Sequence, residues 1–171
     1  MPWWNNALYD TCSLITLDKM LLDYPEMEQH FQGILALEAS FWADQLRRDT
    51  AARIRPRVTY LEGPAASDLA RILTATRLSK ALAQVDKLVC ATAVHHRLTV
   101  VTGDKRLAQA VARAGLYVGN VALVLKTLVR SRALSEVGCN ALLAGLVKRR
   151  EYILPPNYPQ TWATLRHYTF P

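Results

Sequence analysis

Four acidic residues occupy positions where a carboxylate needs a compensating partner. Asp10 and Asp104 each follow a short apolar run, at residues 7–9 and 98–101, of the kind that forms a buried strand. Helical periodicity centres Glu38 and Asp86 on apolar stripes of two predicted helices. Burying a charge is costly unless a cation, a metal ion or a hydrogen-bond network offsets it. These four residues are therefore the candidates for chemistry.

Carboxylates that meet in one pocket repel each other, and a hard divalent cation is the usual relief. Oxygen ligands without a matching Cys or His pair favour Mg²⁺ or Mn²⁺ over Zn²⁺. Such sites hydrolyse phosphodiester bonds. The net charge of +7 and the sequence pI of about 9.6 favour a polyanionic partner, nucleic acid ahead of a membrane surface. A basic surface also simply keeps a protein soluble.

Each candidate also has a structural explanation. Asp10 or Ser13 alone can be explained as the N-cap of a helix, at about even odds. The pair His95-His96 is better explained as a polar helix end than as a metal site, because adjacent helical residues point about 100° apart. Asp18 lacks the central placement of Asp86, so we expect a surface charge there, and Asp44 is interpreted in the same way.

The order of apolar runs and turn residues predicts an α/β protein with one domain. Strands are expected at residues 7–9, 58–61, 98–101 and 116–118. Helices are expected at residues 11–24, 27–48, 67–77 with Ser67 or Asp68 as its cap, around Asp86, and at 105–113, 121–133 and 136–150. The stretch FQGILALEAS within the second of these helices also suits a strand, should Gly33 interrupt the helix.

The predicted arrangement is a central, mostly parallel sheet flanked by helices, with residues 1–118 as the core. Residues 119–171 form a helical hairpin and an aromatic tail packed on the same domain. The aromatic content of the tail indicates that it docks on the chain's own core, on a symmetry mate or on a partner, with the own core as the default.

The N-terminus lacks the pattern of a secretory signal, and no apolar stretch is long enough to span a membrane. The three cysteines, Cys12, Cys90 and Cys139, form no CxxC pair, which indicates reduced thiols that serve as small core residues. We therefore expect a cytoplasmic protein.

Four stretches together resemble the successive motifs of PIN-domain nucleases. They are YDTCSLI from Tyr9, Glu38 on its predicted helix, VDKLVCATA from Val85 and VVTGD from Val100. The resemblance covers about residues 7–118, and within the family the chain is most similar to VapC-like toxins of bacterial toxin-antitoxin pairs. It implies a PIN-like, Rossmann-like sheet and a metal-dependent endoribonuclease that hydrolyses RNA phosphodiester bonds.

The resemblance also implies roles for single residues. Asp10, Glu38, Asp86 and Asp104 would be the acidic ligands of Mg²⁺ or Mn²⁺, Thr102 would lie beside the metal, and Ser13 would support the first motif by hydrogen bonding. Charge and proximity suggest Lys87, Lys105 and Arg106 as phosphate contacts. Expected partners are RNA, a cognate antitoxin and a second copy of the chain.

Two other functions remain open at this point. One is a catalytically silent PIN-like module that binds a protein partner or RNA. The other is a nuclease that acts on DNA or on a 5′ flap, as related folds do.

Overall fold

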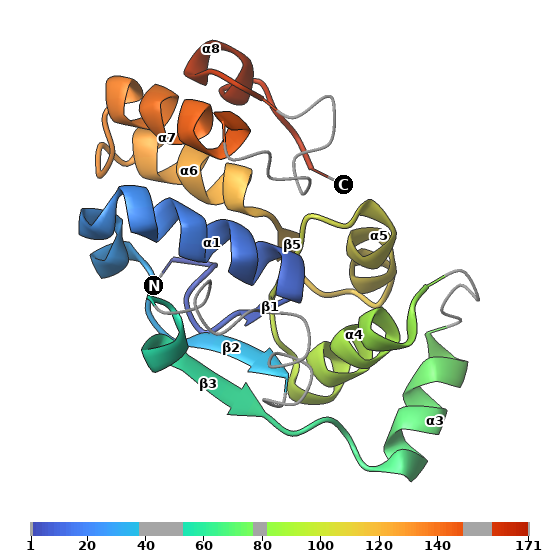
Figure 1. Cartoon of the computed structure of the whole chain (residues 1–171). Coiled ribbons are helices and arrows are strands. Elements are labelled where there is room, and N and C mark those ends of the chain that lie inside the picture. Colours follow the sequence, from blue (N-terminus) through green and yellow to red (C-terminus); the bar gives the residue numbers. More distant parts are fainter. Residues whose placement is uncertain (1, 38–52, 77–81, 149–158, 171) are drawn as a thin grey trace.

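A computed structural model describes residues 2–37, 53–76, 82–148 and 159–170 of the protein (Figure 1). Five strands form one sheet in the order β3-β2-β1-β4-β5, and all four neighbouring pairs are parallel. The strands are β1 (Leu8–Tyr9), β2 (Ile34–Leu37), β3 (Val58–Leu61), β4 (Val100–Val101) and β5 (Val118–Gly119). The prediction of an α/β protein with a mostly parallel central sheet is confirmed.

Helices cover both faces of this sheet. They are α1 (Thr11–Asp23), α3 (Ala66–Ala75), α4 (Gln84–His96), α5 (Lys105–Arg113), α6 (Val121–Arg130), α7 (Glu136–Lys148) and α8 (Trp162–Leu165), with the 3-10 helices η1 (Pro25–His30) and η2 (Arg55–Arg57). In Figure 1, α1, α6 and α7 stack on one side of the strands, and α4 lies on the other. None of the described helices is long and apolar enough to cross a membrane.

Side-chain alternation along the strands divides the core in two. Tyr9 and Val101 pack with α1, α6 and α7, whereas Leu8 and Val100 pack with α4 and α5. Successive strand residues point to opposite faces, so Asp10 and Thr102 continue on the side of Leu8 and Val100. The fold therefore directs both polar residues toward the face that carries α4 and α5.

Polar residues at the strand ends start the next helices. Asp10 caps α1, Asp104 caps α5 and Asn120 caps α6, each by accepting backbone N–H groups of the first turn. Ser135 accepts a hydrogen bond from the backbone N–H of Gly138 at 3.0 Å, which confirms the predicted cap of α7. Each of these strand ends is thus also the start of a helix.

The predicted helix at residues 27–48 is wrong over residues 27–37, and the rest of that range, with Glu38 and Asp44, lies outside the described residues. Its start is the 3-10 helix η1, and residues 34–37 form strand β2. Gly33 separates the two with a φ of +62°, and a Cβ atom there would lie 2.0 Å from the Asn6 side-chain oxygen. The alternative in which Gly33 interrupts the helix is the correct one, so the helical stripe that was expected to centre Glu38 does not exist across residues 34–37.

Three further expectations need correction. Helix α3 begins at Ala66 after Ala65, so Ser67 and Asp68 lie in its first turn and do not cap it. Asp18 is fully buried rather than a surface charge. Cys12 is exposed, although Cys90 and Cys139 are buried as expected and all three are free thiols.

The C-terminal elements pack on the chain's own core, which confirms the default expectation for the tail. Leu165 of α8 is fully buried, and Trp162 and Tyr168 pack against the cluster that α1, α6 and α7 share. The backbone N–H of Trp162 donates to the Asn140 side chain of α7 at 2.7 Å.

Candidate functional site

The carboxyl ends of β1 and β4 bring together residues that are 92 positions apart in the chain. The Thr102 hydroxyl donates to Oδ2 of Asp10, and the backbone N–H of Asp104 donates to the same hydroxyl oxygen at 3.0 Å. From β1 the chain adds β2 and β3 on one side of the sheet, and it then adds β4 and β5 on the other side, so the strand order changes direction between β1 and β4. In open α/β sheets such a switch point, at the carboxyl ends of the strands, is where ligands bind.

Asp10 is the buried member of this group, with 6% of its surface exposed. Its Oδ1 accepts the backbone N–H of Ser13 at 2.7 Å, so the N-cap explanation is correct as far as it goes. A cap does not require burial, and burial raises the pKa of Asp10 to about 6 in spite of the hydrogen bonds from Thr102 and Ser13, which lower it. The charge of Asp86 makes a smaller contribution to this increase.

Asp86 and Asp104 approach from the two helices on the same face. Asp86 is half-buried in the first turn of α4, where Val89, Cys90 and Ala93 on the same helix are buried. Its pKa is raised, first by burial and then by the charge of Asp104. Asp104 is exposed, and its Oδ1 accepts the backbone N–H groups of Arg106 at 2.6 Å and Leu107 at 3.0 Å.

The Cys12 thiol is affected by the charges of all three carboxylates. The residue is exposed, but its thiol is partly desolvated, and this desolvation, followed by the charges of Asp10, Asp86 and Asp104, raises its pKa to about 11. A single thiol in the first turn of α1 therefore lies within the field of all three acids. The thiol is protonated at neutral pH and is a poor nucleophile.

None of the three aspartates forms an ion pair with a Lys, Arg or His side chain among the described residues. Ion pairs within the described ranges include those of Glu28 with Arg53 and Arg57 and that of Asp68 with Arg71. Within the same ranges, no group of three or more His, Cys, Asp or Glu side chains is arranged to hold a metal ion. The fourth predicted acid, Glu38, follows the last residue of β2 in sequence and lies outside the described residues.

The three predicted phosphate contacts lie on the two helices that carry Asp86 and Asp104. Lys87 is half-buried next to Asp86, and Lys105 and Arg106 are exposed in the first turn of α5. Cations are unfavourable at a helix N-terminus, because the exposed N–H groups there already carry partial positive charge. Their placement there favours an anion as a ligand.

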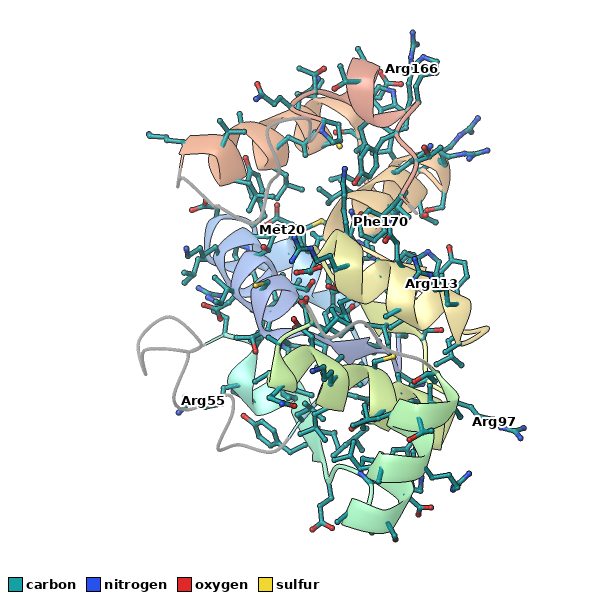
Figure 2. All side chains as sticks on the ribbon, turned by 90° about the vertical axis from the view of Figure 1, so that its right-hand side faces the viewer. Met20, Arg55, Arg97, Arg113, Arg166 and Phe170 are labelled. Carbon is teal, nitrogen blue, oxygen red and sulfur yellow. The ribbon has the colours of Figure 1, made fainter. Side chains whose placement is uncertain are left out.

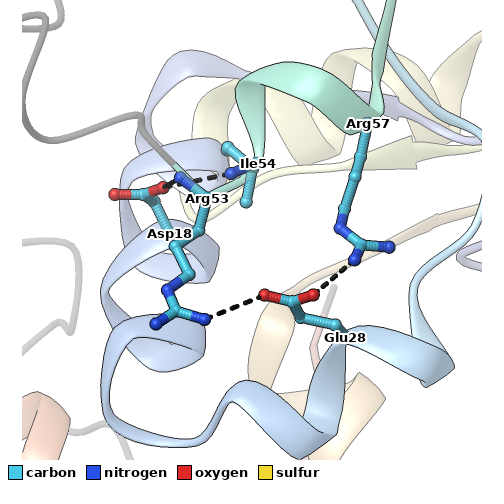
Figure 3. Close-up of polar contacts among 5 residues, drawn as sticks. All are labelled: Asp18, Glu28, Arg53, Ile54 and Arg57. Carbon is cyan, nitrogen blue, oxygen red and sulfur yellow. Dashed lines mark hydrogen bonds and ion pairs between the residues drawn. The ribbon is translucent and has the colours of Figure 1, made fainter.

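Arg53 and Arg57, in contrast, lie away from the acids. Arg53 lies just before η2 and Arg57 is its last residue, and η2 precedes β3 and therefore lies at the amino edge of the parallel sheet. Glu28 accepts a hydrogen bond from Arg53 at 3.3 Å and another from Arg57 (Figure 3). Part of the basic charge of the sequence is thus neutralised locally.

A small hollow opens beside Asp10, between the ends of β1 and β2 and the first turns of α1 and α4. Most of its lining is apolar, with Leu14, Leu37, Val85 and Val89 contributing side chains. The acids therefore border an apolar surface on one side and the exposed bases of α5 on another.

Sequence reasoning missed the buried carboxylate of Asp18. Its Oδ1 accepts the backbone N–H groups of Arg53 at 3.2 Å and Ile54 at 3.3 Å, as Figure 3 shows. The signal was present, because Leu14 and Leu21 lie four residues before and three after it, on the buried side of the same helix.

Comparison of the chain with models of known protein families, with characterised proteins and with solved structures finds no match.

Proposed function

We propose that the protein is a Mg²⁺- or Mn²⁺-dependent endoribonuclease of PIN-like fold that acts as the toxin of a toxin-antitoxin pair. The observation that carries the proposal is the buried Asp10 carboxylate, whose pKa is raised to about 6 while it lies within the field of Asp86. An uncompensated carboxylate costs stability, so a residue of this kind at a sheet switch point suggests a functional demand on its charge.

The donor set suits a hard cation in chemical type. Asp10, Asp86 and Asp104 offer oxygen atoms only, and each carboxylate oxygen that accepts one hydrogen bond retains a second lone pair. The described residues alone do not form a three-ligand group, so Glu38 or a movement of Asp86 toward Asp104 would complete the ligand set. When bound, Mg²⁺ or Mn²⁺ supplies Lewis acidity that lowers the pKa of water and offsets charge on the phosphate.

The chain's own residues divide the remaining work. Asp10 and Asp104 are the primary ligands and Asp86 is a further one, while Glu38 is a ligand or positions the attacking water. Thr102 fixes the relative position of the two primary ligands, because its hydroxyl donates to Asp10 and accepts from the backbone of Asp104. Lys87, Lys105 and Arg106 bind the phosphates on either side of the bond that is cut.

Cleavage of a panel of structured and single-stranded RNAs, with Mg²⁺, Mn²⁺ or EDTA, tests this function. We expect cleavage that needs the ion and that falls at least about 100-fold in Asp10→Asn and Asp104→Asn. Asp68→Asn is the matched control, because Asp68 belongs to α3 and pairs with Arg71. Folded Asp10→Asn and Asp104→Asn proteins that cut RNA as fast as the parent would refute the proposal.

The ligand geometry leaves a second candidate, a catalytically silent PIN-like module that binds a protein partner or RNA. The observation in its favour is that no three-ligand group exists within the described ranges. Calorimetric titration of the parent with Mn²⁺ separates the two functions. The nuclease binds the ion and loses that binding in Asp10→Asn, whereas the silent module binds no ion in either protein.

A further inference from the structure

Asn120 extends the polar row at the carboxyl edge of the sheet by one strand. Tyr9 is in register with Val101, and Val101 is in register with Gly119. The residues that follow, Asp10, Thr102 and Asn120, therefore end three neighbouring strands at one level. Adjacent strands are about 4.8 Å apart, so Asn120 lies two strand spacings, about 10 Å, from Asp10.

The C-terminal tail is anchored at this third position. The Asn120 side-chain amide donates to the Tyr168 hydroxyl at 2.9 Å, and Nζ of Lys126 donates to the Tyr168 carbonyl oxygen at 2.7 Å. Asn120 is 1% exposed and its own oxygen caps α6. These bonds fix the last residues of the chain against the end of β5, next to the strand that carries Thr102.

Phe170 follows the anchor by two residues and is only half-buried. Two residues span at most about 7 Å, so the Phe170 backbone lies within about 7 Å of the Tyr168 backbone, whose carbonyl oxygen is bonded by Lys126 of α6. Figure 2 looks onto the carboxyl edge of the sheet and shows Phe170 at this side of the molecule, near α5. Helix α5 is the element that begins with Asp104, Lys105 and Arg106.

We propose that residues 168–170 form one wall of the RNA-binding path, on which the Phe170 ring stacks against an unpaired base. This inference rests on the proposed ribonuclease function and adds a residue, outside the group of acids, that contacts a base of the RNA. Bases inside a duplex are already stacked on their neighbours, whereas an unpaired base exposes a face to an aromatic ring. Phosphates held by Lys105 and Arg106 would place such a base on the tail side of the acids.

Steady-state cleavage of a short single-stranded RNA by three Phe170 variants tests the stacking. Stacking contributes about 1–3 kcal/mol per base, so Phe170→Ala is expected to raise KM about 5- to 150-fold with kcat nearly unchanged. Phe170→Trp should restore KM, and Phe170→Leu, which keeps apolar bulk without a ring, should not. Tyr117→Ala is the control, because Tyr117 is 54% exposed and precedes β5 at the opposite edge of the sheet.

Binding of the same RNA in EDTA, followed by fluorescence anisotropy, gives a readout that does not depend on cleavage. Phe170→Ala should weaken the binding by the same factor, and a paired RNA should bind equally to parent and variant. If the parent cuts RNA but Phe170→Ala or Phe170→Leu matches it in KM and affinity, the tail inference fails and the nuclease stands. A tail that contacts a protein partner instead of RNA would leave KM and affinity unchanged in these variants. If the parent neither cuts nor binds RNA, both proposals fail.

Discussion

At the scale of single residues, the candidate site contains a carboxylate, Asp10, whose charged form is destabilised by burial. Asp10 is almost fully enclosed, and its hydrogen bonds with Ser13 and Thr102 do not offset the loss of water. The folded protein therefore holds a proton on Asp10 more tightly than the unfolded chain does. Residues kept at a cost to stability are typical of functional sites.

The raised pKa predicts that Asp10→Asn stabilises the protein. The folded pKa is about 6 and the ordinary value is 3.8, so the favourable contribution of the bound proton is lost as pH rises through 6. Each pKa unit corresponds to about 1.4 kcal/mol, which gives a gain of about 3 kcal/mol for the variant above pH 7 and almost none near pH 4. Urea unfolding in EDTA at pH 4.5, 6 and 8 measures the difference.

The control for this prediction is Asp68→Asn. Asp68 pairs with Arg71, which lowers its pKa, and that exposed pair contributes little to stability. Its variant should follow the parent at all three pH values. Equal stability of Asp10→Asn and the parent at pH 8 would show that Asp10 is not strained by its burial.

At the scale of elements, a buried carboxylate joins α1 to the start of η2. Asp18 accepts two backbone N–H groups, and Glu28 holds Arg53 and Arg57 on the surface above it. The bonds link residues that are 35 and 36 positions apart. They fix the path by which the chain enters β3.

Two substitutions separate the charge of Asp18 from its hydrogen bonds. Asp18→Ala leaves two N–H groups near a buried site without their acceptor and is expected to cost about 1–3 kcal/mol. Asp18→Asn keeps the acceptor and removes the charge. Burial raises the pKa of Asp18, so the stability that the protonated form contributes is lost as pH rises above the ordinary Asp value, and the Asn variant should be at least as stable as the parent at pH 7.

Thermal unfolding at pH 7 measures both proteins. Loss of stability in Asp18→Asn equal to that in Asp18→Ala would show that the negative charge itself holds Arg53 and Ile54. Activity on RNA should survive Asp18→Asn, because the residue has no place in the proposed chemistry.

The sequence predicted the elements whose signals are local. Strand β3 and helix α5 were placed at their observed bounds, and Asp10 and Asp104 were placed at strand ends. Strand β2 was assigned to a helix, because a buried apolar run of four residues has no period that separates the two structures. The strand pairs with β1 and β3, and Gly33 breaks the helical run before it with a positive φ, and both features depend on tertiary structure.

At the scale of the whole molecule, the C-terminal hairpin and tail share one core with the sheet. Residues of α6, α7 and α8 form a single cluster with Tyr9, Val101 and the buried face of α1. The acids at the carboxyl edge are therefore supported by packing that extends to Leu165, near the end of the chain.

Leu165→Ala tests this dependence. Leu165 is fully buried, and truncating such a leucine costs about 2–5 kcal/mol. We expect one unfolding transition, shifted to lower urea concentration, with the same loss seen by probes of the tail and of the sheet. Val137→Ala is the matched control on α7, because Val137 is 79% exposed and its truncation should change stability by less than about 0.5 kcal/mol. Two separate transitions in Leu165→Ala would contradict a shared core.

The pairing of β1 with β4 also fixes the time at which the site can exist. A ribosome delivers Asp10 early, but Thr102 and Asp104 join it only after more than ninety further residues have been synthesised. Closing so long a loop carries an entropic cost that only the completed sheet offsets. A nascent chain that ends before β4 therefore has Asp10 and Asp86 but neither Thr102 nor Asp104, so the group of acids is complete only after β4 has been synthesised.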